Sequence, residues 1–328
     1  MKVSLFYKFN TIGGWNEEYS DFLGEAVLAE TEGFEGIYVG ENHFESEGWC
    51  PSPFFPLSSL TTITSRIKLG TNIIALPLHN SIEVSEQIAF LDVLSNGRAI
   101  LGVGLGFKPE EFIAFGRDIK KRKAIYEKNL EEVKKLLSGE AVEAGPYSLK
   151  ISPQPVQKPR IPIWIAARTP GAVKMVVKRG DAWIMDPVTS LAVLQKNLEI
   201  FRSTIADRKV ADFPLRREYF ISKDASEIKK AEDSIVKSYE REYFRWEHLQ
   251  DRDGNLVGPS VANYSEIKDE MLDNMIIGTP SQVIEKMDTY RKRLGITELI
   301  LRMSFKGITS KMRMEAIKLT GELLHEIA

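Results

Sequence analysis

The sequence predicts a single (β/α)8 barrel, or TIM barrel, over residues 1–328, and three observations support this fold class. Apolar runs alternate with amphipathic stretches along the whole chain, which is the pattern of strands that are each followed by a helix. The strand-like runs are apolar throughout, as in Ile163–Ala167, which is expected of strands that are covered on both faces. Eight such runs occur, and eight parallel units in a chain of this length favour a closed barrel over an open sheet.

The first half of the chain supplies four strands and the helices that follow them. Turn residues separate the elements, since Gly33 ends the first helix and Asn96-Gly97 ends the third. We expect strands over Val3–Phe9, Gly36–Gly40, Ile67–Leu76 and Ala99–Leu105, and helices over Tyr19–Glu32, Phe55–Thr64, Ile82–Leu94, Glu110–Phe115 and Arg122–Leu137.

The second half follows a proline-rich link and repeats the pattern. We expect strands over Ile163–Ala167, Ala182–Met185, Arg217–Ser222 and Glu298–Met303, and helices over Gly171–Lys178, Leu191–Ala206, Glu227–Trp246, Pro280–Leu294 and Lys311–Ile327. An irregular stretch is expected before Pro280. Two insertions exceed the needs of a barrel, roughly Gly106–Pro162 after the fourth strand and Phe244–Gly278 before the last helix–strand pair. Loops of this length usually cover a site.

Composition narrows the class of protein. The net charge of -2 gives no reason to expect a nucleic-acid or membrane partner, and no apolar run approaches the roughly 20 residues of a membrane helix. Met1–Asn10 has no basic region or cleavage pattern, so we expect no signal peptide. A single cysteine, Cys50, suits a reducing cytoplasm, and the four histidines form no compact metal-binding spacing.

Polar residues directly follow the second predicted strand, at the end of the barrel where such folds carry their chemistry. They are Glu41, Asn42 and His43. A histidine in this place can act near neutral pH as a base or as a hydrogen-bond donor. A histidine held at the rim by a hydrogen bond is an equally good interpretation. The other histidines are expected to be structural, exposed or part of a loop wall: His79, His248 and His325.

Two further strand ends could contact a ligand. Gly102, Gly104 and Gly106 follow the fourth strand, where they would let a ligand approach the backbone closely or would simply bend the chain at the rim. Thr169 and Gly171 flank a proline that opens a helix after the fifth strand. Free amides and a hydroxyl there can bind a phosphate, although an ordinary threonine N-cap satisfies the same pattern.

Together, these strand-end motifs resemble the luciferase-like flavin monooxygenase family over nearly the whole chain. The strongest similarity lies over Leu69–Phe115, which contains LGT, LDVLSNGR and GVGLG in the family's order. GENHF at Gly40–Phe44, PIWIAART at Pro162–Thr169 and GTPSQV near Gly278 are similar to further family motifs. The resemblance implies a cytoplasmic (β/α)8 enzyme, commonly a homodimer, that uses reduced flavin mononucleotide (FMN) and O2 to oxidise a small organic substrate. A separate reductase usually supplies the flavin.

The resemblance also assigns roles to residues. Asn72 and Ile73 match the position behind the flavin ring, where some members have a non-prolyl cis peptide bond. Matches to the ring and phosphate site are Gly104, Leu105, Gly106, Lys123, Arg168, Thr169, Gly171 and Ala172. This chain departs from bacterial luciferase at two of the matched positions. Leu105 replaces a phosphate-binding arginine, and Asn42 replaces a histidine linked to proton transfer, so we do not predict light emission. Asn42 cannot be a base, and proton transfer would fall to His43 or water.

Three other interpretations remain open. A deazaflavin-dependent hydride-transfer enzyme is also found in this superfamily. The second is a flavin-binding protein without catalysis, because Leu105 and Asn42 depart from the residues expected at these positions. A hydrolase unrelated to flavin is the third, although Glu41 and Asp186 are the only obvious acids at the strand ends. Aromatic residues are expected to line the substrate pocket or to belong to the core: Phe6, Trp15, Trp49, Phe54 and Phe107.

Overall fold

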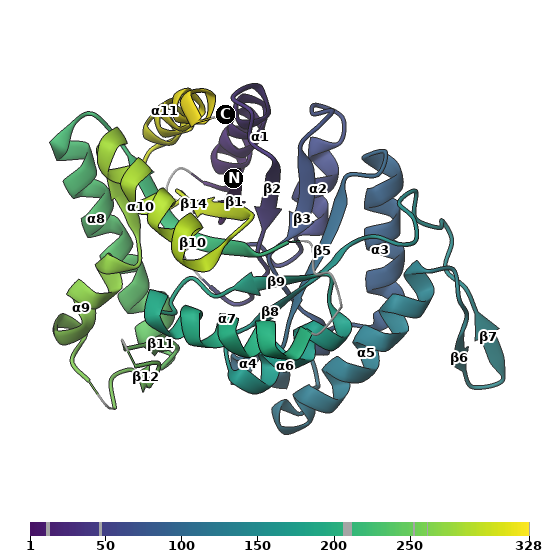
Figure 1. Cartoon of the computed structure of the whole chain (residues 1–328). Coiled ribbons are helices and arrows are strands. Elements are labelled where there is room, and N and C mark those ends of the chain that lie inside the picture. The colour runs from purple at the N-terminus through teal and green to yellow at the C-terminus, as the bar shows by residue number, and fades with distance from the viewer. Residues whose placement is uncertain (11–13, 46–47, 206–211, 252, 261, 328) are drawn as a thin grey trace.

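Eight parallel strands close into a barrel, which confirms the predicted fold class. The computed structural model describes residues 1–10, 14–45, 48–205, 212–251, 253–260 and 262–327. In order around the barrel (Figure 1), the strands are β1 (Lys2–Tyr7), β2 (Gly36–Val39), β3 (Lys68–Thr71), β5 (Ala99–Gly104), β8 (Ile163–Ala167), β9 (Ala182–Met185), β10 (Pro214–Ile221) and β14 (Glu298–Arg302). Pairing of Leu215 with Met185 joins β10 to β9, and pairing of Lys2 with Glu298 joins the first strand to the last.

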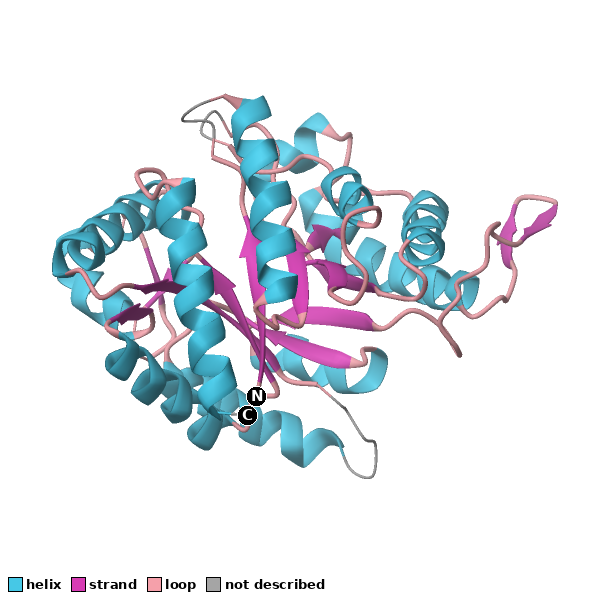
Figure 2. Ribbon diagram, turned by 90° about the horizontal axis from the view of Figure 1, so that it is seen from above, coloured by secondary structure: helices cyan, strands magenta, loops and turns pink. Residues whose placement is uncertain are grey.

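Helices cover the outside of the barrel (Figure 2). They are α1 (Trp15–Thr31), α2 (Phe54–Leu60), α3 (Ser81–Leu94), α5 (Arg122–Leu137), α6 (Pro170–Arg179), α7 (Leu191–Ile205), α8 (Ala225–Tyr239), α10 (Pro280–Leu294) and α11 (Ser310–Ile327). None of the helices in the described ranges is long and apolar enough to cross a membrane.

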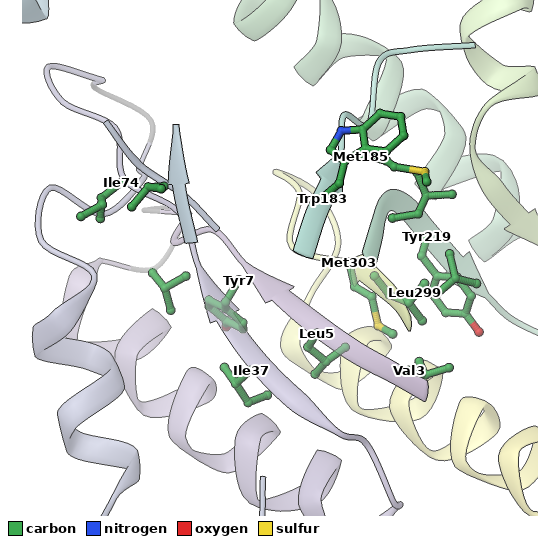
Figure 3. Close-up of a cluster of buried hydrophobic side chains, with 14 of the residues drawn as sticks. Val3, Leu5, Tyr7, Ile37, Ile74, Trp183, Met185, Tyr219, Leu299 and Met303 are labelled. Atoms are coloured by element: carbon green, nitrogen blue, oxygen red, sulfur yellow. The ribbon is translucent and has the colours of Figure 1, made fainter. Parts of the chain in front are cut away.

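Alternation along each strand divides the interior into two layers. On β1, Val3, Leu5 and Tyr7 point outward toward the helices, where they join the buried cluster shown in Figure 3. Phe6 points the other way and packs inside the barrel. Burying each aliphatic side chain of the outer layer stabilises the fold by roughly 1.5–3 kcal/mol relative to exposure.

Both insertions carry secondary structure of their own. The first contains α4 (Pro109–Ala114), a 3-10 turn η2 (Ile119–Lys121) and a hairpin of β6 (Val142–Ala144) and β7 (Tyr147–Leu149), which projects away from the barrel (Figure 1). The second contains a π-helical turn η3 (Glu240–Phe244), a hairpin of β11 (Leu249–Gln250) and β12 (Leu256–Val257), α9 (Tyr264–Asp273) and β13 (Ile276–Gly278).

Several predicted boundaries are wrong. The third strand is divided: β3 ends at Thr71, β4 (Ile74–Ala75) pairs with β5, and a 3-10 turn η1 (Leu76–Leu78) follows. The seventh strand begins three residues earlier than expected, at Pro214. The stretch before Pro280 is not irregular, because α9 packs there and β13 pairs with β10. The last residue of the helix expected over 191–206 lies outside the described residues.

Candidate active site

A cavity of about 480 Å³ lies at the carboxyl ends of the barrel strands. This volume is within the range usual for small-molecule sites, roughly 300–1,000 Å³. The wall is formed by the ends of β2, β3, β5, β8 and β9, by Arg216 near the start of β10 and by parts of both insertions. A second depression, of about 420 Å³, lies between α2 and α3 on the outside of the barrel. Barrel enzymes carry their chemistry at the carboxyl ends of the strands, so the first cavity is the candidate active site.

Glu41 is the centre of a hydrogen-bonded cluster after β2. Its carboxylate accepts hydrogen bonds from His43 Nε2 at 3.1 Å, from His79 Nε2 at 2.6 Å and from the Ala75 amide at 2.7 Å. Burial raises the pKa of Glu41, but the bonds from the histidines outweigh burial and lower it to about 2. Burial lowers the pKa of His79, yet its bond to Glu41 raises it overall. Glu41 is therefore an ionised anchor for both imidazoles.

The three predicted catalytic residues come together at this strand end but differ in their access to the cavity. Glu41 and Asn42 line it. His43 does not: its ring packs edge-on against Phe115 at 4.7 Å, and its amide donates to the Glu111 carboxylate at 3.0 Å. His43 is therefore connected to the cavity through its hydrogen bond to Glu41.

Lys108 is a site residue that the sequence pattern does not reveal. Its side chain is buried, and its ammonium group contacts Asn42 Oδ1 and the Glu45 carboxylate. The same group lies 5.8 Å from the centre of the Trp246 ring. Because Oδ1 of Asn42 accepts from Lys108, the Nδ2 group is left to donate to a ligand. The only signal for Lys108 in the sequence is its place directly after the glycine-rich rim.

The ends of β3 and β5 form one wall of the cavity. The peptide bond between Asn72 and Ile73 is cis. Nδ2 of Asn72 is buried and has no hydrogen-bond partner within the described ranges. Gly104 packs against Ile73, since a Cβ at Gly104 would lie 2.6 Å from Ile73 Cδ1. Leu105 and Gly106 also line the cavity, so the structure brings together all five residues expected here.

The start of α6 lies at the same cavity. Thr169 is the N-cap, and its hydroxyl accepts a hydrogen bond from the Ala172 amide at 3.4 Å. Arg168, Thr169 and Ala172 line the cavity, whereas Gly171 is exposed and lies outside the lining. A helix start with free amides is suited to an anionic group.

Lys123, the expected second cation, lies on the solvent side of α5. It is exposed and is not part of the cavity wall, whereas the preceding residue, Arg122, is. Successive residues of a helix point about 100° apart, so the side chain of Arg122 faces the cavity while that of Lys123 faces the solvent. Arg122 donates to the Gly106 carbonyl at 3.2 Å, which fixes it beside the rim.

The second insertion supplies the facing wall, including His248. The imidazole stacks on Phe107 with ring centres 4.1 Å apart. Arg168 donates to the His248 carbonyl at 2.8 Å and to Nδ1 at 3.3 Å. Burial, reinforced by the charge of Arg168, lowers the pKa of His248 to about 4. The ring is therefore neutral at pH 7 with its hydrogen on Nε2, and it lines the cavity, a role that the sequence reading missed.

The expected aromatic pocket residues separate into three groups. Trp49 and Phe107 line the cavity. Phe6 lies in the barrel interior, with its ring 6.3 Å from that of Trp49. Phe54 lines the outer depression, and Trp15 is exposed on α1. Among the described residues, no group of three histidine, cysteine or acidic side chains is placed to hold a metal ion.

Comparisons with known proteins now add to this geometry. The family model described as luciferase-like monooxygenase matches residues 1–298. The chain is 24% identical over 311 residues to the oxygenase component of flavin-dependent trigonelline monooxygenase from Acinetobacter baylyi, which covers 88% of this chain and 86% of the relative.

Two solved structures share the fold at low identity. One is the oxygenating constituent of 3,6-diketocamphane monooxygenase from Pseudomonas putida in complex with FMN (TM-score 0.74, 16% identity, 98% of this chain and 97% of that chain). The other is the coenzyme F420-dependent tetrahydromethanopterin reductase from Methanopyrus kandleri (TM-score 0.73, 17% identity, 99% of each chain).

Proposed function

Because the chain belongs to the luciferase-like monooxygenase family, we propose that it is an enzyme that uses reduced FMN and O2 to oxidise a small organic substrate. The observation that carries the proposal is one cavity that combines a buried donor without an acceptor in the described ranges, Asn72 Nδ2, with an anion-binding helix start at Thr169. A flat ring that ends in a phosphate needs both features.

The residues present fit such a cofactor. Asn72 Nδ2 is a buried donor without an acceptor in the described part of the chain, and it suits a carbonyl or nitrogen of the ring. The lack of a side chain at Gly104 lets Ile73 pack against the strand beside the cavity. The α6 amides, the Thr169 hydroxyl and the Arg122 guanidinium would hold the phosphate, so that Arg122 takes the part expected of Lys123.

The chain's own groups define how a substrate would be held. When bound, reduced FMN would supply the electrons for O2 to be reduced as the substrate is oxidised. Asn42 donates a hydrogen bond but cannot take up a proton. Glu41 is held ionised by His43 and His79, so the Lys108 ammonium, in contact with Asn42, is the proton donor that we assign to the cavity. Both insertions exclude water from the site.

Two further proposals concern a protein partner of this chain and its oligomeric state. The relative named as an oxygenase component belongs, by that name, to a larger system, and we propose that a separate reductase also supplies this chain with flavin. We also propose a cytoplasmic homodimer. Exposed apolar side chains on α2 and α3, including Phe55 (79% exposed) and Phe90 (54%), support an association through these helices.

A deazaflavin-dependent hydride transferase is the second candidate. The likeness in fold to the F420-dependent reductase equals the likeness to the FMN-containing oxygenase, and it favours neither cofactor. Both cofactors place a flat tricyclic ring and a phosphate in the site, so the same residues fit both.

The test is an anaerobic titration of the purified chain with reduced FMN and with the reduced deazaflavin, each followed by exposure to O2. Tighter binding of FMN, with substrate-dependent oxygen uptake, is expected. Preference for the deazaflavin with no oxygen uptake would establish the second candidate. Binding of neither would refute a flavin function, and FMN binding without turnover of any substrate screened would favour the non-catalytic interpretation.

A further inference from the structure

We propose that the cavity binds a planar substrate through an anionic oxygen, such as a carboxylate, at Arg216 and Trp246. The inference rests on the proposed function, because it names the chemical class of that function's substrate. It concerns the side of the cavity formed by β10 and the second insertion, and not the wall assigned to the flavin.

The first observation is that this side presents donors without acceptors. Arg216 Nε and Trp246 Nε1 are buried, and neither has a hydrogen-bond partner among the described residues. Both side chains line the cavity. Among the described residues, no side-chain carboxylate or amide oxygen that lines the cavity is buried without a hydrogen-bond partner. The group that would complete this hydrogen bonding is therefore an acceptor in the ligand.

The second observation is the charge beneath the cavity. Lys8, Arg216 and Arg302 are buried, and within the part of the chain that the structure describes the carboxylates within 4 Å of them are those of Glu218 and Glu242. Arg302 takes the closer contacts, at 3.1 Å to Glu242 and 3.4 Å to Glu218. Glu218 lies 3.7 Å from Arg216, too far for a hydrogen bond.

Arg216 is the cation of this cluster that reaches the cavity. Asp186 also lines the wall, and the charge of Arg168 acts on it more strongly than that of Arg216. Nη2 of Arg216 donates to the Tyr243 hydroxyl at 2.6 Å, and the Arg216 guanidinium lies 4.5 Å over the Phe6 ring. These contacts fix the guanidinium, and a preorganised, desolvated cation binds an anion more strongly than a solvated one.

The third observation is the shape of the surrounding wall. Trp49, Phe107, Tyr243, Trp246 and His248 contribute rings to the same cavity. Phe107 and His248 are stacked with an angle of 14° between their planes. Rings of this kind favour a flat, unsaturated molecule, which would stack on their faces. The occupant is therefore a planar acid and not an aliphatic amine or a neutral alkane.

The test compares acids with their neutral isosteres. Benzoate and 2-naphthoate, and the matching amides, are titrated into the full chain by calorimetry, with and without FMN. We expect the acids to bind about tenfold or more tightly than the amides, as for a charge-assisted hydrogen bond. Equal affinities, or no binding of either acid up to roughly 10 mM, would overturn the proposal.

Variants locate the site. Arg216→Gln should reduce the preference for acids to about twofold, Arg216→Lys should retain part of it, and Trp246→Phe should weaken acid binding about threefold or more. Lys311→Gln removes an exposed cation from α11, which does not line the cavity, and should change nothing. An unchanged preference in Arg216→Gln and in Trp246→Phe would also refute the assignment. FMN binding is measured on every variant, so that failure of the flavin proposal is distinguished from failure of this one.

Discussion

At the scale of single residues, Glu41 holds together the cluster that follows β2. Its carboxylate is buried and bridges His43, His79 and the Ala75 amide. Glu41→Gln should lower the free energy of unfolding at pH 7 by about 3 kcal/mol, because breaking a buried charged network leaves its partners unsatisfied. Urea denaturation measures the loss. The matched control is Glu315→Gln, an exposed glutamate on α11, which should change stability by less than about 0.5 kcal/mol.

The same variant has a defined pH dependence. The folded pKa of Glu41 is about 2, below its ordinary value, so its stabilisation is present above about pH 4.5 and is lost as the pH falls toward 2. The folded pKa of His79 is raised, so the stability that protonated His79 contributes is lost as the pH rises through this raised pKa. The wild type and Glu41→Gln should thus converge only as the pH falls from about 4.5 toward 2. A difference that stays constant over this interval would contradict the ionised state of Glu41.

Residues of the cavity wall could be located from the sequence where backbone motifs mark the end of a strand. Asn72, Gly104 and Thr169 lie at or near such ends, and all three line the cavity, while their part in cofactor binding stays a prediction. Arg216 was missed because the seventh strand was expected to begin one residue after it, so its inward position could not be recognised. His248 was missed because the second insertion has no periodicity that assigns a direction to a side chain.

At the scale of elements, two helices provide a matched test of the phosphate site. Thr169 caps α6 at the cavity, and Thr279 caps α10 through a capping box. Each Thr→Ala change should lower stability by about 1 kcal/mol through loss of the cap. Only Thr169→Ala should also weaken FMN binding, by roughly 1–3 kcal/mol, because its hydroxyl is assigned to the phosphate. Equal FMN affinity in both variants would place the phosphate elsewhere.

The glycines near the strand ends have different roles, which a second pair of variants separates. A Cβ at Gly102 on β5 would lie 2.0 Å from the Thr71 carbonyl oxygen, so Gly102→Ala should cost about 2–3 kcal/mol by forcing β3 and β5 apart. Gly171 on α6 has open space around its Cβ position. Gly171→Ala should therefore be neutral or stabilising by up to about 1 kcal/mol. Thermal unfolding of both variants measures this contrast, and a stable Gly102→Ala protein would contradict it.

Element order was predictable, and the content of the insertions was not. The βα alternation gives the eight strands because each is an apolar run of ordinary length. The hairpin β11–β12 and the π-helical turn Glu240–Phe244 have no such signal, since two-residue strands and a single turn are specified by tertiary contacts. Tyr243 lies in that turn, and Trp246 and His248 lie between the turn and the hairpin. The wall proposed for the substrate was therefore less predictable than the wall proposed for the cofactor.

At the scale of the whole molecule, one buried carboxylate at each end of the barrel has a shifted pKa, and the two shifts are in opposite directions. At the carboxyl end, burial raises the pKa of Glu242, but the charges of Arg302 and Lys8 outweigh it and lower the pKa to about 2. At the amino end, Glu298 accepts a hydrogen bond from Ser4 Oγ at 2.5 Å. There burial prevails and raises the pKa of Glu298 to about 7. Charge is thus concentrated at the end that carries the cavity, which leaves a pH-sensitive acid at the other.

This asymmetry predicts the response of the fold to pH. A carboxyl with a raised folded pKa contributes stability below its ordinary value, near 4.5, and loses that contribution as the pH rises through about 7. The glutamine side chain in Glu298→Gln is uncharged at every pH. The free energy of unfolding of this variant, relative to that of the wild type, should therefore rise by about 2 kcal/mol between pH 5 and pH 8. Urea denaturation at both pH values measures the change, with Glu315→Gln as the control whose difference stays constant. If the difference for Glu298→Gln were also constant, Glu298 would be in one protonation state throughout. Ionised Glu298 would then need compensation at the amino end of the barrel as strong as that which Arg302 gives Glu242.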